Sequence, residues 1–467
     1  MTVPTIPGPG PAPGLATLRD RAVAAHRAGR RAEALPLYAA ALARAPRDAG
    51  LWTNLGALLR AESRHDLALQ AQERAFALLP ADPGIRNNLA NILNDLGQHE
   101  RSLSLRRDLL SDAPDDPSHP AMAGKALRSL GRLDEGIALL DDALRRFPDD
   151  AETQVQLALT ELAAARYADG FRHYAARWRT GELTPRRIDA PKWDGGPLDG
   201  RTILVLPEQG FGDALCFARV LPTLRRFNPA RVALLAEAPL LRLMQGVDGA
   251  DHVGPGAPPG GFDVWVDMMD LPTLHFAATD TIPPPTRLHI PDDSRARARA
   301  LTAPVRDRFK VGVVWCGSVT YRGNAFRSFP HTELHALLDL PGLQLVSLYK
   351  GPELAAFQAD GTSAFIIDAG SADRDFADCA ALMEEMDLIV TSDTVTAHLA
   401  GSLGRPVWTL LHWDAFWLWG PTGDATPWYP SMRLIRQSAP RDWPGVLARV
   451  RADLKALLRD RTQGSPA

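Results

Sequence analysis

One stretch decides the fold of the second half of the chain, and it reads Thr391-Ser392-Asp393-Thr394-Val395-Thr396-Ala397-His398-Leu399-Ala400-Gly401-Ser402-Leu403-Gly404-Arg405-Pro406. An apolar run, 388–390, precedes it, and a second apolar run, 407–411, follows it. A strand, a tight turn, a helix of small residues and another strand make one unit of a parallel α/β sheet. Unpaired backbone N–H groups and the helix dipole attract phosphate where such a helix begins. The stretch therefore predicts half of a nucleotide site at Asp393 and Thr394.

A purely structural interpretation of the same residues stays open. Ser, Thr and Asp before a helix commonly serve only as its cap. His398 lies one turn past Thr394 on the same helix face, where a single histidine is more often structural than catalytic. The choice between a cap and a nucleotide site depends on what the rest of the chain supplies.

The composition is that of a soluble globular protein, with 467 residues, 45% hydrophobic and 23% charged. The formal net charge is 52 − 55 = −3, which gives no reason to expect a nucleic-acid partner. No apolar run approaches the roughly 18 residues of a membrane span, and residues 1–14 are rich in Pro and Gly without the pattern of a signal peptide. We therefore expect a disordered lead-in at 1–14 and a cytoplasmic protein without a membrane span.

The metal-binding residue types show no site pattern in the sequence. Cys216, Cys316 and Cys379 stand singly, without the paired spacing of a disulfide framework or a zinc motif. Carboxylates are scattered, and histidines do not pair at ligand spacing. We therefore expect no metal site.

The first third of the chain repeats every 34 residues. The period is carried by a proline row, by two rows of small residues and by a looser turn row: Pro46, Pro80, Pro114, Pro148; Ala22, Gly56, Ala90, Gly124, Ala158; Ala34, Ala68, Ser102, Gly136, Gly170; Gly29, Ser63, Gly97, Gly131, Ala165. Small residues let paired helices approach closely, and proline ends the second helix of each pair. The spacing resembles tetratricopeptide repeats, and Trp52-Thr53-Asn54-Leu55-Gly56 fits their pattern. We expect about five helix pairs in an α-solenoid over 15–178.

Such an array presents a groove that binds peptide, and one row of side chains suits that role. The position two before the first small-residue row is Asp20, Asn54, Asn88, Met122 and Gln156. Stacked amides hydrogen-bond a peptide main chain without reading its side chains. Asparagine here resembles the ladder of repeat-bearing protein O-glycosyltransferases, which implies a protein acceptor or partner at Asn54 and Asn88. Ordinary solvent-facing polar positions remain the alternative.

After the array, strands alternate with helices in two consecutive blocks. Apolar strand runs start near 202, 232 and 262 in the first block and near 311, 343, 365, 388 and 407 in the second. This alternation predicts two Rossmann-like lobes with a cleft between them, over 190–303 and 308–440. Residues 283–307 join the lobes, and 441–467 form a C-terminal helix and tail.

Four segments of this region are similar to bacterial heptosyltransferase-like (glycosyltransferase family 9-like) enzymes. They are Glu208-Gln209-Gly210-Phe211-Gly212-Asp213, Trp315-Cys316-Gly317-Ser318 with Arg327-Ser328, Ser347-Leu348-Tyr349-Lys350-Gly351, and Asp393-Thr394 through Gly404-Arg405-Pro406. The resemblance implies a GT-B fold whose second lobe holds a nucleotide-sugar substrate and whose first lobe presents the acceptor. It also implies a final helix that crosses back onto the first lobe.

Site residues follow from these segments. Without a metal, helix N-termini and Arg or Lys must meet the phosphate charge. We expect the donor at Gly317, Ser318, Arg327, Lys350, Asp393, Thr394, Val395, Thr396 and His398, with Arg322 and Asn324 in the same loop; Val395 departs from the glycine common in lipopolysaccharide heptosyltransferases. Surface charge is the alternative for Lys350 and Arg327.

The general base is expected at Asp213. It follows a strand and two glycines, Gly210 and Gly212, that let the backbone turn tightly. The matching aspartate of the heptosyltransferases has this role, and Glu208 and Gln209 complete the acceptor loop; a helix cap is the alternative for Asp213. The aromatic segment 411–420 with Trp428 and Tyr429 either stacks on a base or sugar or packs the lobe.

The leading hypothesis is a glycosyltransferase that modifies a protein recruited by the repeats, with flagellin-like surface protein as the client. Transfer to lipopolysaccharide or another surface polysaccharide, with the repeats holding a partner enzyme, is one alternative. A non-catalytic repeat scaffold is the other.

Overall fold

The computed structural model describes residues 14–321 and 323–463, so Arg322, most of the expected lead-in and the last four residues lie outside the described part. The chain divides into two compact units, Met1–Thr153 and Gln154–Ala467. Each unit is considered by itself below.

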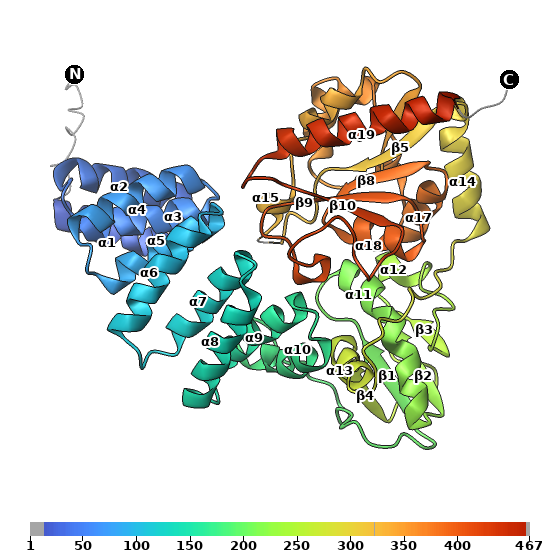
Figure 1. Ribbon diagram of the computed structural model, residues 1–467, viewed down its shortest axis with the longest axis horizontal. Coiled ribbons are helices and arrows are strands. Elements are labelled where there is room, and N and C mark those ends of the chain that lie inside the picture. The colour runs from blue at the N-terminus through green and yellow to red at the C-terminus, as the bar shows by residue number, and fades with distance from the viewer. Residues whose placement is uncertain (1–13, 322, 464–467) are drawn as a thin grey trace, which may run out of the picture. The chain divides into compact units, whose positions relative to one another are not determined.

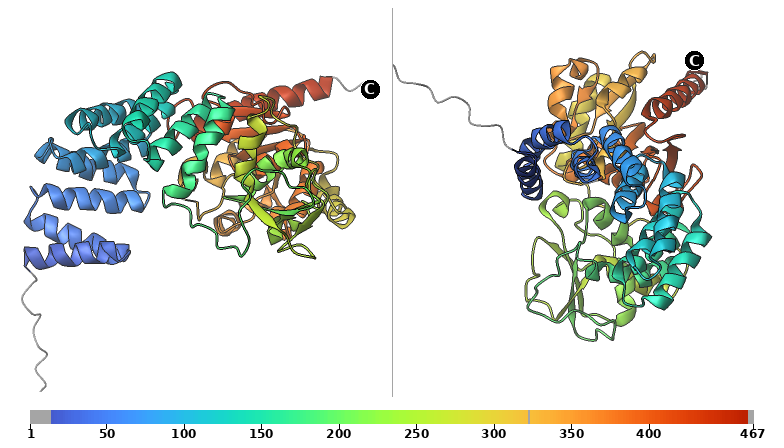
Figure 2. Two further views of the ribbon diagram at one scale, coloured as in Figure 1. Left: turned by 90° about the horizontal axis from the view of Figure 1, so that it is seen from below. Right: turned by 90° about the vertical axis from the view of Figure 1, so that its left-hand side faces the viewer.

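Ten consecutive helices open the chain, as the 34-residue period predicted (Figure 1). Their bounds are α1 Leu15–Arg27, α2 Arg31–Arg44, α3 Ala49–Ala61, α4 His65–Leu78, α5 Pro83–Asp95, α6 His99–Asp112, α7 Ser118–Ser129, α8 Leu133–Arg146, α9 Ala151–Ala163 and α10 Tyr167–Tyr174. Figure 2 shows the first of them stacked as hairpins, which is the arrangement of a tetratricopeptide solenoid. The helical repeat is therefore confirmed.

The repeat rows have clear structural roles. All five residues of the turn row are left-handed, with φ of 71° at Gly29, 58° at Ser63, 74° at Gly97, 70° at Gly131 and 57° at Ala165. This conformation favours glycine, so the row is set by the backbone. The small-residue rows allow close packing: a Cβ on Gly124 would lie 2.5 Å from Cδ1 of Leu140 in the paired helix.

The second unit contains two parallel sheets. The smaller sheet has the order β3-β2-β1-β4, with β1 Thr202–Leu206, β2 Arg231–Leu235, β3 His252–Gly254 and β4 Val264–Asp267. Its helical segments are α11 Phe211–Phe217, the 3-10 helix η2 Ala218–Phe227, α12 Ala238–Leu241 and α13 Leu271–Phe276. The short strand β3 was not predicted, because only three residues pair there.

The larger sheet has the order β10-β9-β8-β5-β6-β7. Its strands are β5 Phe309–Val314, β6 Leu343–Ser347, β7 Ile367–Asp368, β8 Leu388–Ser392, β9 Val407–Leu411 and β10 Met432–Arg436. Every registered strand pair in both sheets is parallel, as the alternation of strands and helices predicted. The helices of this region are α14 Asp292–Thr302, α15 Asn324–Arg327, α16 Leu354–Ala359, α17 Phe376–Glu384, α18 Val395–Ser402 and α19 Trp443–Gln463.

Two segments differ from the sequence expectations. Much of the expected link, 283–307, is the helix α14, which packs on α17, with Arg295 Nε 2.8 Å from Glu384 Oε2. The larger-sheet region thus begins near residue 292 instead of 308. The expected crossing of the final helix onto the first lobe is not seen among the described residues. The helix α19 packs instead on β10 and on the 3-10 helix His331–Leu337, with its Val446 and Val450 buried (Figure 1).

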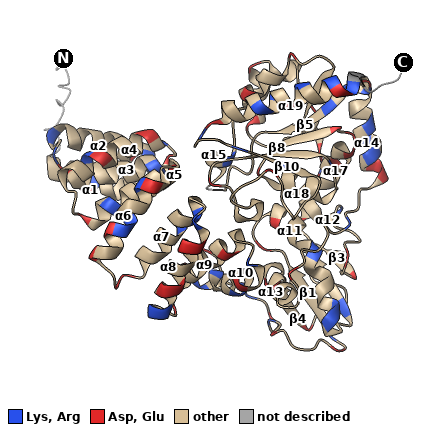
Figure 3. Ribbon diagram, viewed as in Figure 1, with Lys and Arg blue, Asp and Glu red and all other residues tan. Residues whose placement is uncertain are grey.

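Charges of both signs are intermixed along the helices and around the sheets (Figure 3). None of the helices in the described ranges has the length and apolar character needed to cross a membrane.

Candidate functional site

Each parallel sheet has one point where the strand order reverses. In the smaller sheet it lies between β1 and β4, and in the larger sheet it lies between β5 and β8. Ligands of open α/β sheets bind at such switch points, outside the carboxyl ends of the strands. The predicted site segments follow β1, β5 and β8. The fold therefore brings the acceptor loop and most of the donor residues to the two switch points.

The segment after β5 is organised by Asn324. The N–H of Gly317 donates to Oδ1 of Asn324 at 3.1 Å, and the hydroxyl of Ser328 donates to the same oxygen at 3.0 Å. A Cβ on Gly317 would lie 2.7 Å from that oxygen, 2.9 Å from Thr394 and 3.0 Å from Arg327. Glycine at 317 is thus required because the segments after β5 and β8 meet there.

The segment after β8 combines a helix cap with a buried carboxyl group. Thr394 caps α18, since its hydroxyl accepts the N–H of Thr396 at 3.4 Å and lies 2.6 Å from the Thr396 hydroxyl. Burial raises the pKa of Asp393, while the charge of Arg327 acts to lower it. Thr394 and Thr396 therefore shape the helix start, with half-buried Val395 as the first helical residue, and Asp393 and Arg327 supply the charge.

His398 lies on α18, the helix that packs on α11 of the smaller-sheet region. Its Nδ1 lies 3.1 Å from the Tyr429 hydroxyl, and its ring packs on Trp419 with centroids 5.3 Å apart. Burial lowers the pKa of His398 to about 3, and the nearby charges of Arg219 and Arg327 act in the same direction. With the imidazole neutral, the contribution expected of His398 at the donor is a hydrogen bond and packing, and not positive charge.

Position 212 must be glycine because His398 packs directly against it. A Cβ on Gly212 would lie 2.8 Å from Cδ2 of His398. The expected tight turn at the glycines is wrong: Gly210 has φ −102°, and the left-handed residue of the loop is Gln209 at φ 65°. Gly212 instead permits α11 to approach α18 across the lobes.

Several buried polar atoms at the larger switch point have no hydrogen-bond partner among the described residues. They are Nε of Arg327, Oγ of Ser392 and Nδ1 of His412, which follows β9. Buried polar groups are nearly always satisfied. Unpaired groups at the carboxyl ends of adjacent strands are expected where a polar ligand completes the site. His412 was not singled out from the sequence, although its place directly after a strand was the available signal.

Asp213 is the third helical residue of α11 and is half-buried. Its Oδ2 accepts the N–H of Gly210 at 3.0 Å, so the capping interaction is present. Burial, together with the charges of Glu208 and Asp393, raises the pKa of Asp213 to about 6 against the effect of that bond. Because α11 packs on α18, Asp213 lies on the helix that meets the segment after β8, which carries Asp393.

The rest of the acceptor loop is engaged by the protein itself. Glu208 is buried and receives two hydrogen bonds from Arg177, and the Gln209 amide donates to the Tyr174 hydroxyl at 2.6 Å. Neither partner was identified from the sequence, because 31 to 35 residues separate the groups.

Two expected donor residues bond to neighbouring groups of the protein. The ammonium of Lys350 donates to the carbonyl oxygen of Asp373, beside the outer strands β6 and β7. The exposed hydroxyl of Ser318 pairs with Thr320 at 2.7 Å. Next to Lys350, burial raises the pKa of Asp373 to about 8, with the charge of Asp378 acting in the same direction. The sequence did not predict that Asp373 would be a buried carboxyl group with a raised pKa beside Lys350.

The aromatic segment divides between packing and exposure. Trp417, Trp419, Trp428 and Tyr429 are buried, whereas Trp413 and Phe416 are 42% and 38% exposed. Packing accounts for the buried members, and the two exposed rings remain available to a ligand.

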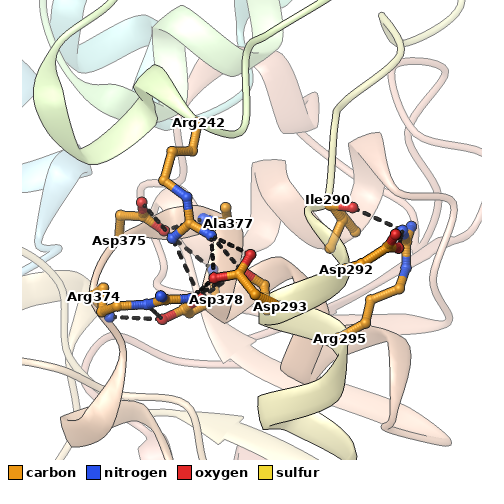
Figure 4. Close-up of polar contacts among 10 residues, drawn as sticks. Arg242, Ile290, Asp292, Asp293, Arg295, Arg374, Asp375, Ala377 and Asp378 are labelled. Carbon is orange, nitrogen blue, oxygen red and sulfur yellow. Dashed lines mark hydrogen bonds and ion pairs between the residues drawn. The ribbon is translucent and has the colours of Figure 1, made fainter.

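Ion pairs also join the lobes, away from the switch points (Figure 4). Arg242, which follows α12, lies 3.2 Å from Asp375 and 3.0 Å from Asp293. Asp375 caps α17, accepting the N–H of Ala377 at 3.0 Å. Burial opposes it, yet hydrogen bonds from Arg374 hold the pKa of Asp378 well below its usual value. The cluster ties α12 to α14 and α17.

In the helical unit, the expected amide ladder is partly used internally. The Asn88 amide donates to the Thr53 hydroxyl at 3.3 Å, and Asn54 is half-buried. Two hollows lie elsewhere in this unit. One is apolar, with a volume of about 360 Å³, and it is lined by Leu103, Arg107, Leu110, Ala123, Leu127, Glu135, Ala138 and Leu139. The other is polar, with a volume of about 20 Å³, and it is lined by Arg60, Asn91, Asn94, Asp95, Ser102, Arg106, Met122 and Lys125.

Comparison with known proteins identifies the repeats. The tetratricopeptide repeat family model matches residues 121–160. The Protein FlbA of Caulobacter vibrioides is 27% identical over 343 residues, which is 65% of this chain and 55% of that protein. The chain thus spans little more than half the length of this relative.

Among solved structures, MamA from Desulfovibrio magneticus RS-1 is 16% identical with a TM-score of 0.33, covering 36% of this chain and 97% of that one. MamA of strain AMB-1 is 20% identical with a TM-score of 0.31, covering 37% and 98%. Scores this low support no inference about fold or function. Among the described residues, no three His, Cys, Asp or Glu side chains gather as metal ligands.

Proposed function

We propose that this chain is a GT-B glycosyltransferase that moves a sugar from a nucleotide-sugar to an acceptor recruited by the repeats. The observation that carries the proposal is the packing of α11, which carries Asp213, against α18, which begins just after Asp393. The pKa of Asp213, raised by burial to about 6, suits a general base near neutral pH.

The chemistry divides between the lobes. The acceptor hydroxyl gives its proton to the Asp213 carboxylate as its oxygen bonds to the anomeric carbon of the sugar. The bond from that carbon to the phosphate oxygen breaks, and the leaving phosphate takes the electron pair. The guanidinium of Arg327 and the start of α18 stabilise the phosphate charge, and the mechanism assigns no metal ion. Lys350, which follows β6 at the carboxyl ends of the larger sheet, is proposed to contact the donor as well.

The acceptor is proposed to be a protein, because tetratricopeptide arrays bind peptides. A flagellin-like surface protein is the client to test first. Such a reaction requires the repeats for acceptor modification but not for donor binding.

The first experiment is a thermal-shift screen of UDP, GDP, CMP and their sugar conjugates with the full chain. A ligand raises the melting temperature only if it binds the folded state. We expect one nucleotide class to stabilise the protein. If none does, the chain is a non-catalytic scaffold.

The second experiment removes the array at the boundary of the compact units, giving a chain that starts at Gln154. A cut after 178 would also remove Phe171, which is buried in the core of the second unit. We expect the shortened chain to bind nucleotide normally and to lose modification of a protein acceptor. Undiminished modification would favour a polysaccharide or lipid-linked acceptor.

A further inference from the structure

The last repeat hairpin belongs to the same compact unit as the sheets. Phe171 of α10 stacks on Phe276 of α13, with centroids 5.4 Å apart and planes at 6°. It also meets Phe217 of α11 edge-on at 5.9 Å. The helix that carries Asp213 is therefore packed directly against the hairpin.

Arg177, in the 3-10 helix η1 (Ala175–Arg179) after α10, reaches the smaller switch point. Its Nε and Nη2 donate to Glu208 at 2.6 and 2.7 Å, and Nη2 also donates to Asp270 at 2.7 Å. The side chains of Arg177 and Glu208 are only 5% and 3% exposed. Removing one partner of a buried pair leaves an uncompensated buried charge, so this contact holds the loop firmly.

The residue after Glu208 is strained. Gln209 has a left-handed backbone, φ 65°, a conformation that is unfavourable for a residue with a side chain. Its amide is held by the Tyr174 hydroxyl of the hairpin. The next N–H, that of Gly210, donates to the Asp213 carboxylate. Arg177, just after the hairpin, thus fixes Glu208, and Tyr174 of the hairpin fixes Gln209. These two residues immediately precede Gly210, whose N–H binds Asp213.

We propose that Arg177 and Tyr174 are positioning residues, which hold the strained 208–210 turn so that the Asp213 carboxylate keeps its productive orientation. The inference rests on the proposed function, in which Asp213 is the general base. It assigns the last tetratricopeptide hairpin to the catalytic machinery, whereas the earlier repeats serve recruitment.

Four groups face Asp213 and bear on its titration. They are Glu208 from its own loop, Asp393 directly after β8, the Tyr174 hydroxyl from the hairpin, and the neutral imidazole of His398 from α18, which meets the neighbouring Gly212. Because the charge of Glu208 raises the pKa of Asp213, Glu208→Gln is expected to move the acid limb of the pH–rate profile to lower pH.

The test uses the full chain with Arg177→Met, and Arg179→Met as the matched control, because Arg179 is exposed on the same helix. Hydrogen exchange of the peptide 206–214 is measured without any ligand. Nucleotide release from UDP-N-acetylglucosamine, GDP-mannose and CMP-sialic acid is measured across pH. We expect Arg177→Met to speed exchange and lower kcat about tenfold or more with KM for the donor unchanged.

Tyr174→Phe keeps the buried ion pair and removes only the bond to Gln209, so it remains informative if Arg177→Met does not fold; a smaller change in the same direction is expected. Loop exchange in both variants equal to that of Arg179→Met would overturn the inference. Full nucleotide release by Asp213→Asn would instead overturn the general base, and the exchange data would still stand.

Discussion

The two switch points of the second unit satisfy their polar groups in opposite ways. At the smaller sheet, Arg177, Arg186 and Lys192 pair with Glu208, Asp267 and Asp270 at 2.6 to 2.8 Å. At the larger sheet, polar atoms of Arg327, Ser392 and His412 lack partners within the described ranges. An unsatisfied buried group costs about 1–3 kcal/mol. The contrast is that charged groups pair with one another at the smaller sheet, whereas unpaired polar atoms gather at the larger sheet, where we propose that the donor binds.

The largest effect is expected where the rigid edge carries its reactive group. Asp213→Asn should lower turnover by about 10²–10⁴-fold, the usual contribution of a general base. Wild-type activity should rise with pH through about 6, where the carboxyl loses its proton. The pH–rate profile of nucleotide release tests both points.

The same group gives a stability signature. Because its folded pKa lies above the ordinary 3.8, the folded state binds the proton more tightly, and the free energy of unfolding falls as pH rises from about 4 to 6. Asp213→Asn removes that slope. Asp263→Asn is the control and should keep normal turnover. Asp263 lies at the amino ends of the strands of the same sheet, where its carboxylate accepts the N–H of Thr202 at 2.7 Å.

Next comes the open edge. Arg327→Met should weaken nucleotide binding about 10–100-fold, because a charge-assisted hydrogen bond contributes about 1.5–3 kcal/mol. Titration calorimetry with the nucleotide found in the thermal-shift screen measures this. Arg308→Met is the control: it changes an exposed arginine directly before β5, whereas Arg327 follows that strand, and it should leave the affinity for nucleotide unchanged. Equal affinities for the two variants would remove Arg327 from the site.

A third change asks whether the open edge is truly unsatisfied. Ser392→Ala should raise the free energy of unfolding of the ligand-free protein by about 1 kcal/mol, since a buried hydroxyl without a partner is removed. Ser347→Ala is the matched control in β6, because its hydroxyl accepts the N–H of Tyr349 at 3.3 Å and its loss should destabilise. Chemical denaturation measures both; destabilisation by Ser392→Ala would show that the hydroxyl has a partner.

The smallest effect is expected at the ion pairs that join the two lobes. Arg242→Ala should cost less than about 1 kcal/mol, because the side chain is 32% exposed and salt screens such pairs. Thermal unfolding at low and high salt checks this, with Arg225→Ala, which pairs with Asp251 inside one lobe, as control. A loss of several kcal/mol confined to Arg242→Ala would mean that this cluster, and not the α11–α18 contact, holds the switch points together.

The sequence by itself determined the features that depend on neighbours along the chain. The 34-residue period placed the helix hairpins, and its turn row marks backbone positions that are left-handed even where Ser63 and Ala165 replace glycine. Alternating apolar runs and small-residue helices gave parallel sheets, and the ends of β1, β5 and β8 located the candidate site. These are local properties, since hydrogen bonding, capping and periodicity act over a few residues.

Only the tertiary structure decided which groups meet across long separations. Gly212 looked like a turn residue but is small because His398, 186 positions later (398 − 212), packs against it. Glu208, expected in the acceptor loop, forms a buried ion pair with Arg177, and burial lowers the pKa of His398, expected at the donor. Charge and burial are set by what the fold brings together, and no periodicity along the chain records that.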